Sequence, residues 1–126
     1  MRPTDEALVS AARQSKEKAY APYSHFSVGA AVDGDDGKVY TGCNVENGSY
    51  GLTSCAERNA VFAAVAAGCR KIYSVAIVAD EDYTLPCGAC RQVLAEFSAE
   101  RIILTAKDGR YRVMKAKELF PQPFSL

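Results

Sequence analysis

The sequence predicts an α/β fold, a three-layer α/β/α domain in which helices cover both faces of a mixed five-stranded sheet. The sheet begins with a hairpin of alternating apolar residues (26–46), and two apolar strands then alternate with two helices (55–106). A short turn leads into a last strand (107–114). The 126 residues suffice for one domain with one core, to which we assign residues 1–126.

The N-terminal half is expected to form a covering helix and a hairpin. Residues 4–18 carry apolar side chains near helical spacing, and the Ala-Pro-Tyr-Ser stretch after them ends the helix. Residues 26–32 alternate as a strand with Phe26 at its start. A turn rich in Gly and Asp follows, and the return strand extends from residue 38 to about 46.

The C-terminal half is expected to contain helix 55–67, strand 72–79, helix 87–97, strand 101–106, strand 111–114 and a short helix 115–120. The first of these strands is almost continuously apolar, as in strands covered on both faces. Its alternation with helices predicts right-handed crossovers and parallel pairing. Residues 107–110 are too few for a crossover, so the last strand should return antiparallel.

Two cysteine clusters are placed at predicted helix starts, Cys55-Ala56-Glu57-Arg58 and Pro86-Cys87-Gly88-Ala89-Cys90. Ser54 and Glu57 have the spacing of a capping box, which would put Cys55 in the first turn of a helix ending at Gly68. The positive end of a helix dipole favours thiolate, the form that binds zinc. A Cys-x-x-Cys alone is a weak signal, because redox motifs and structural zinc sites share it. Cys-Ala-Glu at one helix start and Pro-Cys-x-x-Cys at another is the signature of zinc nucleobase deaminases.

The number of ligands favours a catalytic zinc site. Structural zinc sites close with a fourth protein ligand, whereas catalytic sites leave that position to water. Cys69 lies past the far end of the first helix, roughly 20 Å from Cys55 at the rise of an α-helix. Cys43 should face away from the neighbouring strand positions, and His25 is distant in sequence from both clusters. We therefore expect one zinc ion per chain in an open site, with a structural or redox cysteine site as the alternative.

Composition narrows the partners. Fifteen residues of each sign give a net charge of zero, which argues against binding nucleic acid by neutralising phosphates. No apolar run is long enough to span a membrane, so no membrane partner is expected. Five cysteines do not suggest a disulfide framework, and reduced thiols point to the cytoplasm.

Four segments resemble the small homotetrameric cytidine deaminases, in the same order: residues 21–31 (APYSHFSVGAA), 42–47 (GCNVEN), 55–58 (CAER) and 86–92 (PCGACRQ). The resemblance implies strand order 2-1-3-4-5. It also implies hydrolysis of cytidine and 2'-deoxycytidine to uridine and 2'-deoxyuridine with release of ammonia, a step of pyrimidine salvage. Two alternatives stay open: a related zinc deaminase acting on another base or nucleoside analogue, and a non-catalytic zinc-binding module.

The resemblance also implies roles for residues at the metal. Glu57 would carry protons between water, ring nitrogen N3 and the leaving amine. The alternative is that Glu57 serves only as the capping partner of Ser54, a role that involves no chemistry. Three thiolates on Zn²⁺ leave a net negative charge, which donors around the sulfurs usually offset. Arg58 would supply hydrogen bonds to the sulfurs, and Arg91 would do so too unless it forms a structural salt bridge.

The implied substrate is a free nucleoside. Its ribose would be held by Asn44 and Glu46, which are two residues apart and should share a strand face. Further substrate contacts are expected from Phe26 (stacking on the base), Gly48 (backbone N–H to the ring oxygen), Ala56, Tyr50 and Phe124. The family often has Ala-Ala or Ala-Cys where this chain has Gly48-Ser49, so a looser loop is expected. In the family, the tyrosine and the C-terminal phenylalanine reach a neighbour's site, which implies a homotetramer with shared sites.

Overall fold

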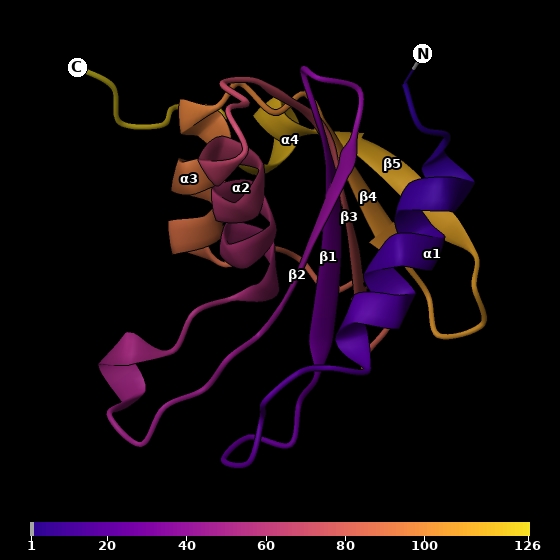
Figure 1. Cartoon of the computed structure of the whole chain (residues 1–126), viewed down its shortest axis with the longest axis vertical. Helices are drawn as coiled ribbons and strands as arrows, with labels where there is room; N and C mark the ends of the chain where they lie inside the picture. Colours follow the sequence, from indigo (N-terminus) through magenta and orange to yellow (C-terminus); the bar gives the residue numbers. More distant parts are fainter. Residues whose placement is uncertain (1) are drawn as a thin grey trace.

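The computed structural model describes residues 2–126, which form a five-stranded sheet in the order β2-β1-β3-β4-β5 (Figure 1). The predicted fold class is confirmed. In chain order the elements are α1 (Asp5–Lys16), β1 (Val28–Gly34), β2 (Val39–Cys43), the 3₁₀ turn η1 (Tyr50–Leu52), α2 (Ala56–Ala66), β3 (Ile72–Ala79), α3 (Gly88–Glu96), β4 (Arg101–Thr105), β5 (Tyr111–Lys115) and α4 (Ala116–Leu119). Within residues 2–126, no helix has the length and apolar character needed to cross a membrane.

Strand directions follow from the connections. The hairpin pairs β1 antiparallel to β2, and β1 also pairs antiparallel to β3. Strands β2 and β3 therefore run in the same direction on either side of β1, and α2 is the crossover between them. The predicted parallel pairing of β3 with β4 and the antiparallel return of β5 are both present.

Helices cover both faces of the sheet, with α1 on one face and α2, α3 and α4 on the other (Figure 1). The alternation of β1 divides its side chains accordingly. Ala30 and Val32 pack in the core under α2 and α3, while Ala31 packs against Leu8 and Ala12 of α1. Alternate residues of β1 thus belong to the two cores on opposite faces of the sheet.

Two glycines allow helices to approach the sheet closely. A Cβ at Gly29 would stand 2.0 Å from the Ala12 carbonyl oxygen of α1. One at Gly42 would stand 2.5 Å from the Ala60 nitrogen of α2. Only glycine fits at these positions without displacing a helix.

The hairpin strands are shorter than predicted at the end that faces the cysteines. Strand β1 begins at Val28 rather than at Phe26, and β2 ends at Cys43 rather than at Glu46. The side chain of Asn44 takes over from the ladder, because its Oδ1 accepts from Val28 N (2.9 Å) and its Nδ2 donates to Phe26 O (2.8 Å). The prediction that Asn44 and Glu46 share a strand face is therefore wrong.

Beyond β2 the chain forms a loop whose two ends are joined by hydrogen bonds. Val45 N donates to Ser54 O (2.9 Å) and Ser54 N donates to Val45 O (3.0 Å). Val45 also forms a parallel bridge with Tyr20, just after α1. Residues 46–53 thus leave and re-enter the fold at one point, immediately before α2.

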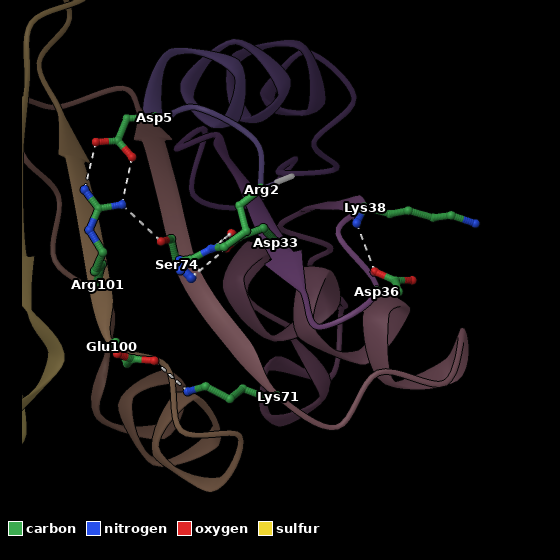
Figure 2. Close-up of polar contacts among 9 residues, drawn as sticks. All are labelled: Arg2, Asp5, Asp33, Asp36, Lys38, Lys71, Ser74, Glu100 and Arg101. Carbon is green, nitrogen blue, oxygen red and sulfur yellow. Dashed lines mark hydrogen bonds and ion pairs between the residues drawn. The ribbon is translucent and has the colours of Figure 1, made fainter.

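Polar contacts join the first helix to the sheet (Figure 2). The Arg101 guanidinium donates to both carboxylate oxygens of Asp5, at 2.8 Å each, and to Ser74 Oγ at 3.2 Å. Asp33, only 1% exposed, accepts from Ser74 N (2.7 Å) and from Arg2 Nε (3.3 Å). These contacts link α1, β1, β3 and β4.

Candidate active site

The N-termini of α2 and α3 bring three cysteines together. Cys55 is the N-cap residue of α2, Cys87 is the N-cap of α3, and Cys90 lies in the first turn of α3. The Sγ atoms of Cys55 and Cys87 are 3.8 Å apart, those of Cys87 and Cys90 are 3.4 Å apart, and all three lie within 4.8 Å of one another. Both helix dipoles place their positive ends at this cluster.

The predicted capping box of α2 is wrong. Ser54 lies one residue before the cap, and its Oγ donates to Asn59 Oδ1 (2.7 Å) instead of serving the helix end. Asn59 Nδ2 in turn donates to the Cys43 carbonyl (2.8 Å). Asn59 therefore ties the start of α2 to the end of β2. The only sign of this role in the sequence is a polar residue next to the apolar run of the predicted helix.

The sulfur cluster fits zinc. Tetrahedral Zn–S bonds of about 2.3 Å place sulfur atoms about 3.8 Å apart, close to the separations found here. Among residues 2–126, these three cysteines are the only group of three or more metal-binding side chains. Cys43 donates instead to Lys18 O (3.4 Å), and Cys69 is buried elsewhere in the core.

Hydrogen bonds favour the thiolate form of Cys55. The hydrogen bond from Cys90, together with one from Arg58 Nη2 (3.3 Å to Sγ), outweighs burial and lowers the pKa of Cys55 to about 5. The pKa of Cys90 is raised, first by its hydrogen bond to Cys55 and then by burial. Arg58 thus contacts a sulfur, as a donor that offsets thiolate charge would.

Glu57 is the second residue of α2 and is only 5% exposed. Burial raises its pKa to about 7, and the charge of Cys55 acts in the same direction, while Arg58 opposes it. A carboxyl with a pKa near neutrality can both accept and release a proton at physiological pH.

Arg91 contacts backbone rather than sulfur. Its Nε donates to Pro86 O (2.8 Å) and its Nη1 donates to Leu119 O (3.0 Å). Neither a sulfur contact nor a salt bridge of Arg91 is present within residues 2–126. It fixes the chain just before Cys87 and joins α3 to the end of α4.

A second group of polar residues lies around Glu46. Its Oε1 accepts from Tyr23 N (2.9 Å) and Ser24 N (3.1 Å), and its Oε2 accepts from Ser24 Oγ. The Ser24 hydroxyl holds the pKa of Glu46 below its usual range. Tyr23 and Tyr50 pack edge to face at 5.7 Å, and together with Ser24, Glu46 and Thr53 they line a cavity of about 300 Å³.

The turn before β1 is held from two sides. Phe26 N donates to Ser24 Oγ (3.1 Å), and Phe26 O accepts from the buried Asn44 side chain. Tyr23 and Ser24 were predicted only as part of the stretch that ends the first helix. Their contacts with Glu46 depend on a residue more than twenty positions away.

The remaining predicted residues are dispersed. Ala56 is buried as the first residue of α2, and a Cβ on Gly48 would stand 3.0 Å from the Tyr23 hydroxyl. Phe124 is 71% exposed near the C-terminus, which lies at the opposite end of the molecule from the loop after β2 (Figure 1). A single chain therefore does not bring Phe124 to the cavity at Glu46.

A larger cavity of about 680 Å³ lies beside α3 and α4, with Leu94 and Leu119 in its lining. Neither this cavity nor the smaller one is lined by a cysteine of the cluster or by Glu57. The smaller cavity, which Glu46 lines, lies at the loop after β2, and this loop leads directly into α2.

A three-sulfur metal group beside a buried carboxyl of near-neutral pKa is the arrangement of zinc-dependent hydrolases that activate water. The comparisons agree. The family model described as "Cytidine and deoxycytidylate deaminase zinc-binding region" matches residues 2–106. The chain therefore belongs to the cytidine and deoxycytidylate deaminase family, whose cofactor is zinc.

Individual relatives resemble it along most of its length. The cytidine deaminase of Sporosarcina psychrophila is 46% identical over 123 residues, covering 95% of this chain and 90% of that protein. The crystal structure of cytidine deaminase from Burkholderia pseudomallei has a TM-score of 0.89 at 49% identity, covering 97% of this chain and all of that one. That from Mycobacterium tuberculosis has a TM-score of 0.83 at 41% identity, covering 98% and 100%.

Proposed function

We propose that the chain hydrolyses cytidine and 2'-deoxycytidine to uridine and 2'-deoxyuridine with release of ammonia. The observation that carries this is the meeting of three cysteine sulfurs with a buried glutamate at two helix starts. Relatives that cover nearly the whole chain bear the name cytidine deaminase.

Cys55, Cys87 and Cys90 would hold one zinc ion per chain. The bound ion supplies a Lewis acid that lowers the pKa of water toward neutrality. Arg58 stabilises the thiolate of Cys55, and Arg91 holds the Pro86 carbonyl so that Cys87 keeps its place. The ligand set is supported by the sulfur separations and by the absence of another such group in residues 2–126.

Glu57 would move the protons. Water adds to C4 of the pyrimidine, and Glu57 accepts a proton from it and passes that proton to N3. The C4–N bond then breaks while Glu57 carries a second proton to the departing amine, so that ammonia leaves and the carbonyl of uridine forms. Its pKa of about 7 suits a group that acts as base and then as acid.

The cavity at Glu46 would take the nucleoside. Glu46 and Asn44 would position the ribose, which is supported by the place of Glu46 in the lining of this cavity. Phe26 lies on the turn that both residues hold. Gly48 lies in the loop after β2, and Ala56 is the first residue of α2, into which this loop leads; both would contact the substrate. The net charge of zero is consistent with a free nucleoside as substrate. It argues against a nucleic-acid partner, which would require positive charge to neutralise phosphates.

We further propose a homotetramer with shared sites, acting in pyrimidine salvage in the cytoplasm as a single domain of residues 1–126. Tyr50 is 74% exposed in the loop after β2, and Phe124 is 71% exposed near the C-terminus. This loop and the C-terminus lie at opposite ends of the molecule (Figure 1). A neighbouring copy could bring a phenylalanine to the cavity that this chain's own tail does not reach. All five cysteines are unpaired, in keeping with a reducing compartment.

An absorbance assay of zinc-loaded protein with cytidine, 2'-deoxycytidine and free cytosine tests the activity. Turnover of both nucleosides with little turnover of cytosine is the expected result. Equal turnover of cytosine would refute the ribose contact. No turnover of any of the three, with zinc fully bound, would favour the non-catalytic module.

Light scattering and mixed chains test the assembly. The expected mass is about 54 kDa, four times the 13.6 kDa of one chain. A chain lacking residues 124–126, mixed with a Glu57→Gln chain, should regain activity, because one site can combine an intact Glu57 with another chain's Phe124. A fully active monomer of 13.6 kDa would contradict the proposal.

A further inference from the structure

The helix that carries two of the three sulfurs also holds the C-terminal segment. Gln92 Nε2 donates to Phe124 O (3.0 Å), and Phe124 N donates to Gln92 Oε1 (3.1 Å). The carboxamide of Gln92 thus pairs with both backbone groups of Phe124, as one strand residue pairs with another. Its neighbour Arg91 holds the Leu119 carbonyl at the start of the same segment.

Packing contributes little to the position of this segment. Residues 121–126 are all exposed, and the groove of about 680 Å³ between α3 and α4 remains open beside them. Within residues 2–126, the two bonds to Gln92 are the only hydrogen bonds that reach residues 121–126. The direction of the tail past Phe120 is therefore set by Gln92.

The side chain of Phe124 does not benefit from this anchoring. Phe124 is 71% exposed as a residue although both its backbone N–H and its carbonyl are held. Ordering a residue costs conformational entropy, and an exposed ring recovers no hydrophobic free energy. An aromatic residue whose backbone is held while its side chain lies in solvent is available for contact with another surface.

We propose that Gln92 is a positioning residue, which fixes the backbone of Phe124 so that its ring enters the nucleoside site of a second copy of this chain. This inference rests on the shared sites of the proposed function. Helix α3 then has two tasks, because it supplies sulfurs to its own zinc site at Cys87 and Cys90 and presents an aromatic ring to a different site.

Fluorescence tests the anchoring without reference to activity. The sequence contains no tryptophan, so Phe124→Trp introduces a single reporter in the zinc-loaded assembly. Adding Gln92→Ala should lower the anisotropy of this tryptophan and increase its quenching by acrylamide. Gln122→Ala is the matched control, because it removes a carboxamide from the segment that carries Phe124, and the Gln122 side chain makes no hydrogen bond within residues 2–126. Equal anisotropy in the Gln92→Ala and Gln122→Ala proteins would overturn the assignment.

Kinetics test the consequence for the substrate. Gln92→Ala should raise KM for cytidine about 5- to 50-fold, the range for two modest hydrogen bonds, with kcat changed less than about twofold and zinc content unchanged. Gln92→Glu keeps the acceptor for Phe124 N but loses the donor to Phe124 O, so its KM should fall between. If Gln92→Ala does not fold, Gln92→Glu supplies the same comparison.

A double-mutant cycle separates positioning from a structural role. In a Phe124→Ala background, Gln92→Ala should cause no further rise in KM. A full additional rise would show that Gln92 acts through α3 itself and would overturn the proposal. If Phe124→Ala alone leaves KM unchanged while the anisotropy still depends on Gln92, the shared site fails and the positioning role fails with it, although the anchor exists.

Discussion

The role of Glu57 depends on where helix α2 begins, because a shift of the helix start by one residue removes Glu57 from the capping position. In the predicted capping box it would be the third residue of the helix and would bind the backbone of Ser54. Because the helix begins after Cys55, Glu57 is the second residue, and the third is Arg58. Burial then leaves a carboxyl with a pKa of about 7 beside the sulfurs.

Glu57→Gln should therefore keep the fold and the zinc and lose turnover. A proton carrier contributes roughly 10²- to 10⁴-fold, and one that serves several transfers should reach the upper end of this range. Glu96→Gln, an exposed change on α3, is the control for removing a carboxylate. Cytidine turnover within about tenfold of wild type would leave Glu57 without a catalytic role.

The ligand assignment predicts different zinc contents for two cysteine variants. Cys87→Ala should lose zinc because it removes one of the three sulfurs at the helix starts, and Cys69→Ala should keep a full equivalent because Cys69 lies elsewhere in the core. Elemental analysis of the purified proteins decides the matter. Full zinc in Cys87→Ala would remove this residue from the ligand set.

At the scale of elements, the joint between β2 and α2 fixes the position of the cysteine cluster relative to Asn44 and Glu46. Gly42 lets α2 lie directly on β2, and Asn59 bonds to the last carbonyl of that strand. Cys55 starts the helix, while Asn44 and Glu46 follow the strand. The cysteine cluster and the loop that carries Glu46 therefore depend on the same helix–strand contact.

Gly42→Ala should destabilise this joint. Its Cβ would lie 2.5 Å from Ala60 N and 2.6 Å from Ala56 O, so α2 must move. Such overpacking costs about 1–3 kcal/mol, which thermal unfolding would register as a lower Tm. Gly51→Ala is the control, because no heavy atom lies within 4 Å of a Cβ there. An equal Tm for the two variants would show that α2 adapts without cost.

At the scale of the whole molecule, the Asp5–Arg101 pair connects residues 96 positions apart and predicts a dependence of stability on pH. The hydrogen bond from Arg101 holds the pKa of Asp5 below its ordinary value of 3.8. A lowered folded-state pKa stabilises the protein above the unfolded value, and the contribution is lost as pH falls through the folded value. Partial exposure limits it to less than about 1 kcal/mol.

Asp5→Asn should accordingly lower the Tm at neutral pH, and its difference from wild type should shrink between about pH 5 and pH 2. Glu96→Gln, which has no ion pair within residues 2–126, should show no such trend. A Tm difference for Asp5→Asn that is independent of pH would assign its effect to helix capping or packing.

How much the sequence predicts depends on how local each interaction is. The apolar run of β3 and the periodic helices were predictable because their patterns lie within one element. The strand order came only through the resemblance to a family. Ser54 was misassigned because Asn59, five residues further on, accepts the hydrogen bond of its hydroxyl, a pairing that no capping pattern indicates. Strand β2 ends early because the side chain of Asn44 takes over the contacts to Val28 and Phe26. The Gln92–Phe124 pairing joins residues 32 apart with no periodic pattern to indicate it.

The hydrogen-bonded closure between Val45 and Ser54 makes the loop after β2 exchangeable. Both ends of residues 46–53 are fixed at one point, so changes within the exposed stretch 47–52 need not disturb the sheet or the sulfur cluster. The entropic cost of closing a loop rises only slowly with the length of the loop, so insertions there should be tolerated. Under the proposed function this stretch carries Gly48 and Tyr50, so libraries that vary it would test substrate selection while the sulfur cluster stays unchanged.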